Sequence, residues 1–196
     1  MIFEALQLLR AELAAYLTAP GRDEQAQVEL GNIASGTEDQ VLLSLVNLEE
    51  EAALRNSTPY QRNPTGGFDV VNPPVFLNLF VLVAAYSRDN STYATALKRI
   101  AWAVQCFQQR NNFSVANTLS TSLESAADPA LLRLRLSLDL YSLSFEKVSQ
   151  LWTTLGGKQM PCVLYKVRLV EEQAEGRLGH GPAITSIEQR PLLAAR

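Results

Sequence analysis

Apolar positions in the first segment of the chain recur at alternating steps of four and three. They are Ile2, Leu6, Leu9, Leu13 and Tyr16. Because an α-helix repeats about every 3.6 residues, these side chains would line one face of an amphipathic helix. Pro20-Gly21 is expected to end that helix, since these residues favour a turn.

Five later stretches show the patterns of β-strands, at residues 27–33, 41–49, 75–86, 132–141 and 162–170. The run 75–86 is apolar almost throughout, with Asn78 as its one strongly polar residue, which suits a central strand buried on both faces. In 132–141 leucines alternate with polar residues, so one face would be buried and the other solvated.

Two further helices are expected between these strands. Asn90 or Ser91 would cap the first, whose buried face is predicted to be Tyr93, Leu97, Ile100, Val104 and Phe107. Ser144 would cap the second, a shorter helix with Val148, Leu151, Trp152 and Leu155 as its buried stripe and Gly156-Gly157 at its end. Residues 55–74 are rich in Asn, Ser, Thr, Pro and Gly and are predicted to form the longest loop.

These patterns predict an α+β fold in a single domain, with a mixed β-sheet flanked by helices. The length of 196 residues suits one domain, and no internal linker is evident. We expect the domain to span residues 1–172 and residues 173–196 to form a Gly-rich tail, in which Ile184 and Ile187 could add a short edge strand.

Composition narrows the classes of partner. The hydrophobic fraction of 47% and charged fraction of 19% are typical of a globular chain, and the net charge of −3 argues against a nucleic-acid partner, which requires a concentrated basic surface.

The longest apolar run is shorter than the roughly 20 residues of a membrane-spanning helix. Without a recognisable secretory signal, we expect a reducing, cytoplasmic environment with Cys106 and Cys162 as reduced core residues.

The sequence offers little for catalysis. His180 is the one imidazole and lies in the expected tail, so it is interpreted as a solvated loop residue and not as a general base. One His and two Cys are too few for a structural zinc site in a single chain, and the paired glycines lack the Lys-Ser or Lys-Thr of a phosphate-binding loop. We therefore expect neither an enzyme nor a bound cofactor or metal.

Three consecutive carboxylates, Glu49, Glu50 and Glu51, follow an expected strand. On a strand at most Glu49 and Glu51 share a face, because successive side chains point in opposite directions. A site for a cation or for acid-base work is one interpretation. The interpretation we prefer is a charged strand end that blocks unwanted pairing, with Arg55 as a possible partner.

Several segments occurring together in order resemble the cap or tail-terminator protein family of extracellular contractile injection systems, of the antifeeding-prophage type. They are LGNIA (residues 30–34), VLLSLVNLEEEAALRN (41–56), NPPVFLNLFVLVAAY (72–86), YATALKRIAWAVQCFQ (93–108) and LWTTLGGKQMPCVLYKVRLV (151–170). The resemblance spans most of residues 1–170 and implies a phage tail-terminator-like fold.

The resemblance also implies a structural protein that closes the end of an inner tube and contractile sheath as a six-membered ring. Its expected partners are copies of itself and the sheath and tube proteins, in a particle assembled in the cytoplasm. We expect the contact surface to include Glu49, Glu50, Glu51, Arg55, Tyr60 and Phe68, since exposed loops carry function more often than core strands. The alternative is a stand-alone adaptor module of the same fold that binds another protein.

Overall fold

The computed structural model describes residues 2–35, 39–51, 60–62, 67–71, 75–114, 117–118, 134–156, 159–172 and 177–181. Its helices are α1 (Ile2–Leu17), the short 3-10 helix η1 (Ile33–Ser35), α2 (Asn90–Gln109) and α4 (Phe145–Thr154). Its strands are β1 (Gln27–Leu30), β2 (Gln40–Glu50), β3 (Tyr60–Arg62), β4 (Phe68–Val71), β5 (Val75–Ala85), β6 (Asn112–Ser114), β7 (Arg135–Leu140), β8 (Cys162–Glu172) and β9 (Arg177–Gly181).

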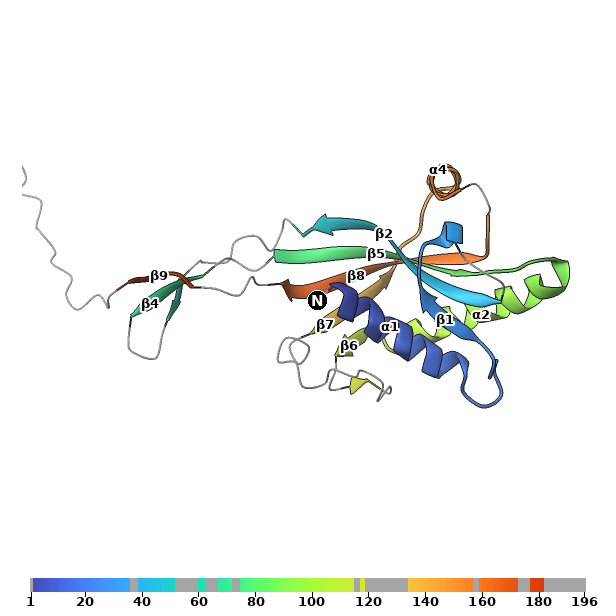
Figure 1. The fold of residues 1–196 in the computed structure, drawn as a ribbon, viewed down its shortest axis with the longest axis horizontal. Helices are drawn as coiled ribbons and strands as arrows, with labels where there is room; N and C mark the ends of the chain where they lie inside the picture. The colour runs from blue at the N-terminus through green and yellow to red at the C-terminus, as the bar shows by residue number, and fades with distance from the viewer. Residues whose placement is uncertain are drawn as a thin grey trace, which may run out of the picture.

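The described strands form two sheets. The main sheet has six strands in the order β1-β2-β5-β8-β7-β6, with β1 parallel to β2 and the other pairs antiparallel. The small sheet has the order β3-β4-β9 and is antiparallel. Figure 1 shows the small sheet beyond the ends of β5 and β8, away from the helices. The mixed sheet expected from the sequence is therefore confirmed.

Helices cover both faces of the main sheet (Figure 1). We call the side under α1 and α2 the helix-pair face; it holds the larger core, which includes Leu79, Val81 and Val83 of β5. The opposite side, the α4 face, holds a smaller core with Phe80 and Leu82 under Trp152 of α4. Alternate residues of β5 therefore enter different cores, which explains why its sequence is apolar almost without interruption.

The buried face of α2 differs from the prediction. Its buried residues are Ala96, Arg99, Ala103, Cys106 and Phe107, whereas Tyr93 and Leu97, which were predicted to be buried, are each 47% exposed. Small alanines allow the helix to approach the sheet closely, and Phe107 packs edge-to-face on Phe113 and Tyr165. The helix is thus rotated so that a polar side chain, Arg99, faces inward.

Buried ion pairs tie the helices to neighbouring segments. Arg99 Nε contacts Asp23 Oδ2 at 2.7 Å, and Arg99 Nη1 donates to the main-chain oxygen of Asp39 at 2.7 Å. In α1, the buried carboxylate of Glu12 accepts from the guanidinium of Arg110 and the hydroxyl of Thr118. Because a buried charge is costly without partners, these contacts fix where α1 and α2 lie.

The cap of α2 is one residue before Asn90, the earlier of the two predicted caps. Asp89, and neither Asn90 nor Ser91, is the N-cap: its Oδ1 accepts from the main-chain nitrogens of Ser91 at 2.9 Å and Thr92 at 3.0 Å. Thr92 completes a capping box by accepting from the main chain of Asp89. For α4 the predicted cap is confirmed, since Ser144 Oγ accepts from the Lys147 nitrogen.

Two segments predicted to lack regular structure contribute strands. The predicted loop 55–74 contains β3 and β4, and the expected tail after residue 172 contains β9. β9 pairs with β4 and places His180 opposite Asp69, so His180 lies in a strand and not in a loop. Short strands of this kind are stabilised by pairing with distant segments, which their own composition does not reveal. Ile184 and Ile187 lie outside the described residues.

Candidate functional site

The glutamates at the end of β2 point to opposite faces of the main sheet. Glu49 lies across from Asn78, and in β5 Asn78 alternates in step with Phe80 and Leu82, so Glu49 lies on the α4 face. Glu51 follows two positions later on the same face, and its nitrogen donates to the main-chain oxygen of Phe76 at 2.8 Å. Glu50 is opposite Leu77, on the helix-pair face.

Both carboxylates on the α4 face have polar partners, and those of Glu51 come from other strands. Asn78 Nδ2 donates to Glu51 Oε2 at 3.0 Å, and Lys166 Nζ lies 3.6 Å from the same oxygen. Asn47 Nδ2 donates to Glu49 Oε1 at 3.0 Å. Side chains of β5 and β8 therefore hold Glu51, just after the end of β2, whereas Glu49 contacts a neighbour in β2 itself.

A second ion pair on the same face joins β8 to β7. Arg168 Nη2 contacts Asp139 Oδ2 at 2.7 Å, and both side chains are about half exposed. The site residues predicted from the sequence do not include Asn78, Asp139, Lys166 or Arg168. The available signal was Asn78, because an amide inside an apolar strand needs polar partners from neighbouring strands.

The other predicted contact residues lie in the small sheet. Tyr60 in β3 is 61% exposed and Phe68 in β4 is 37% exposed, while Arg55 lies outside the described residues. In the register of the sheet Tyr60 is opposite Val70, and Phe68 is opposite both Arg62 and Gly181. The predicted surface is therefore divided between the end of the main sheet and the small sheet.

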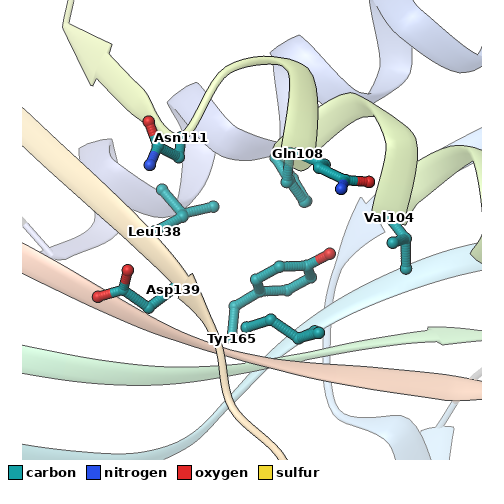
Figure 2. A pocket seen from close by; sticks show the side chains of 8 residues that line it. Val104, Gln108, Asn111, Leu138, Asp139 and Tyr165 are labelled. Atoms are coloured by element: carbon teal, nitrogen blue, oxygen red, sulfur yellow. The ribbon is translucent and has the colours of Figure 1, made fainter.

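A cavity of ≈ 330 Å³ lies between the end of α2 and strands β7 and β8 (Figure 2). Val104 and Gln108 line it from α2, Leu138 and Asp139 from β7, and Tyr165 from β8. Burial raises the pKa of the Tyr165 phenol to about 12, with a smaller contribution from Cys106, so the phenol stays protonated at neutral pH. This lining can accept a side chain, but it offers no activated nucleophile.

The remaining chemistry-bearing residues are held in the interior or apart from each other. Burial raises the pKa of Cys106 to about 12 and also raises the pKa of Cys162, and both cysteines are free thiols. In the described part of the chain, no three His, Cys, Asp or Glu side chains lie close enough to hold a metal ion. Among the helices of the described ranges, none is long and apolar enough to cross a membrane.

Comparison with known proteins gives two kinds of match. The model of the Pvc16 N-terminal domain family matches residues 4–186. The PVC sheath/tube terminator of an extracellular contractile injection system, solved in its extended state, has a TM-score of 0.63 and 15% identity, covering 100% of this chain and 64% of that chain. The anti-feeding prophage cap, a tube-terminating cap, has a TM-score of 0.61 and 12% identity, covering 97% and 60%. No curated protein matches.

These structures share the fold of this chain, and the predicted tail-terminator-like α+β class is confirmed. The chain spans less than two thirds of the length of each of them.

Proposed function

Since the chain belongs to the Pvc16 N-terminal domain family, we propose that it helps to close the end of the inner tube and contractile sheath of a phage-tail-like injection particle. One observation carries the proposal: the family match over residues 4–186 coincides with a fold shared by a sheath/tube terminator and a tube-terminating cap. The resemblance found in the sequence pointed to the same family.

In this role the chain is a structural protein and not an enzyme. It assembles as a ring of six copies, and its partners are the sheath and tube proteins of the particle. A ring of identical subunits needs two different surfaces on each copy, one that meets the next copy and one that meets the polymer. The exposed groups at the end of the main sheet and in the small sheet together supply a candidate for one of these surfaces.

For contact with the polymer we propose the surface formed by Glu49, Glu50, Glu51, Arg55, Tyr60 and Phe68. Exposure of Tyr60 and Phe68 supports it, because aromatic side chains are enriched at interfaces. Glu49 supports it as well, since an exposed carboxylate at a strand end can select a basic partner.

The capping role is tested by assembling particles with and without this chain. Electron microscopy of negatively stained particles should show sheaths and tubes of uncontrolled length without the chain and restored length when it is supplied. Normal length and integrity without it would refute the role. A stable monomer that binds neither sheath nor tube protein would instead favour an adaptor function.

The proposed surface is tested with the triple variant Glu49→Ala, Glu50→Ala, Glu51→Ala, which should bind sheath or tube protein more weakly than the unaltered chain. Glu146→Ala, an exposed glutamate on α4, is the matched control. Normal particle length with the triple variant would remove these glutamates from the contact surface.

A further inference from the structure

One edge of the main sheet is open over part of β2. β1 pairs with β2 through Gln40 to Leu43 only, and in the described part of the chain no strand continues this pairing. The next residues, 45–49, keep β5 on one side. We call residues 45–49 the open edge; four of its five side chains are exposed, and Val46 is half-buried.

Every second residue of the open edge near Glu51 has main-chain groups that point away from β5. Glu51 donates its N–H to Phe76 of β5, and hydrogen-bonded pairs alternate along an antiparallel ladder. By this alternation Asn47 and Glu49 face β5, so the N–H and C=O of Leu48 face outward. Before the register shift between Leu45 and Asn47, the odd-numbered residues of β2 face away from β5, as the bond from the Gly31 N–H to the main-chain oxygen of Leu43 indicates. The shift adds one residue to β2, so after it the even-numbered Leu48 faces outward.

The two faces of the open edge differ in chemistry. Leu45 and Leu48 are opposite Val81 and Leu79, which places them on the helix-pair face, where they are 37% and 43% exposed. Asn47 and Glu49 are opposite Phe80 and Asn78 and lie on the α4 face. A strand added here would meet leucines on one side and a carboxylate on the other.

A second polar group supports a basic occupant on the α4 face. Asn78, the neighbour of Glu49 across the ladder, is 3% exposed, and its Oδ1 has no donor in the described part of the chain. A buried carbonyl oxygen without a donor adds negative potential beside Glu49, which favours a lysine or arginine over that carboxylate.

We propose that the open edge accepts an extended segment of a different protein chain, in which apolar and basic residues alternate. Main-chain hydrogen bonds to the outward groups of Leu48 give affinity, and the alternation gives specificity. A second copy of β2 fits less well, because it would bring its own glutamates beside Glu49. This inference rests on the proposed capping function and names the partner chemistry of one surface.

The test measures binding of a short fluorescent peptide of alternating lysine and valine to the full chain by fluorescence anisotropy. We expect saturable binding that weakens about tenfold or more when the peptide amides are N-methylated, or when its lysines and valines are grouped instead of alternating. Equal binding of the alternating and grouped peptides would overturn the inference, since bulk charge would then explain it.

Two variants, each with its own control, test where the peptide binds on the chain. Leu48→Pro removes an outward N–H that β5 does not use, and it should weaken binding about tenfold, whereas Leu48→Ala keeps the N–H and should weaken it less. Glu49→Lys should favour an alternating glutamate and valine peptide instead, while Glu24→Lys, the same change at an exposed position elsewhere, should not. Unchanged binding to both Leu48→Pro and Glu49→Lys would overturn the proposal.

Three further outcomes are informative. No binding of any peptide would show that the bulge and Glu49 close this edge, against the proposal. Self-association without peptide that Leu48→Pro abolishes would assign the edge to a second copy, also against it. Peptide binding that follows the predicted pattern in a chain that fails to cap particles would support the edge and count against the capping function alone.

Discussion

The side-chain amide of Asn78 donates to the carboxylate of Glu51 at 3.0 Å, although 27 positions separate them in the chain. Asn78 lies in the centre of the main sheet and Glu51 just after β2 ends. The bond therefore connects the buried sheet to the acidic strand end on which the proposed contacts depend.

Replacing Asn78 should destabilise the protein. For Asn78→Ala we expect the free energy of unfolding to fall by about 1–3 kcal/mol, because Glu51 loses a donor and the buried position loses side-chain contacts. Urea unfolding followed by circular dichroism measures this change. Asn47→Ala removes an exposed amide that contacts Glu49 and should cost less than about 0.5 kcal/mol. Equal losses in the two variants would contradict the role given to Asn78.

The Arg99 guanidinium is expected to be a major contributor to stability. Arg99→Leu should lower the free energy of unfolding by about 3 kcal/mol or more, because Asp23 and the main-chain oxygen of Asp39 lose their partner. The matched control is Lys98→Leu, on the exposed side of the same helix, which should change stability by less than about 0.5 kcal/mol. Thermal or urea unfolding of both variants measures these changes. If Lys98→Leu lowered the free energy of unfolding as much as Arg99→Leu, the stabilising role of Arg99 would be refuted.

The N-cap of α2, Asp89, should make a pH-dependent contribution to the stability of the folded protein. Hydrogen bonding, first from the Ser91 hydroxyl and then from the Thr92 main chain, lowers the pKa of Asp89 from 3.8 to about 2. A folded-state pKa below the unfolded value means that the stabilisation is present above pH 3.8 and is lost as the pH falls through about 2.

The difference in urea midpoint between the unaltered chain and Asp89→Ala should therefore stay constant at neutral pH and shrink below about pH 4. The uncharged cap Ser144 provides the control, because the effect of Ser144→Ala should not follow this titration. A difference for Asp89→Ala that is independent of pH would show that its charge does not contribute.

Cys106 should resist thiol reagents in the folded protein. Since burial raises its pKa to about 12, only roughly one ten-thousandth of the thiol is ionised at pH 8. In a Cys162→Ala variant, we expect reaction with an aromatic disulfide reagent to be slow in buffer and fast in urea. Reaction in buffer at the rate of free cysteine would show that the region around α2 opens readily.

Local sequence patterns determined most helices and long strands of this protein. The step of four and three positions predicted α1, and the apolar run flanked by turn residues predicted β5 as a central strand. Ser144 marked the start of α4 correctly. These features depend on residues within one or two turns of each other, so a single chain segment contains the information.

Tertiary structure alone decided the rest. The small sheet joins β4 to β9, more than a hundred positions later, and nothing in the short segments β3, β4 and β9 specifies that pairing. The rotation of α2 depends on Asp23 reaching Arg99, and the open edge depends on β1 ending opposite Leu43. Sequence identified Glu49 and Glu51 as sharing a face, but the partners of Glu51, Asn78 and Lys166, come from other strands. Side-chain contacts across a sheet depend on strand order and register.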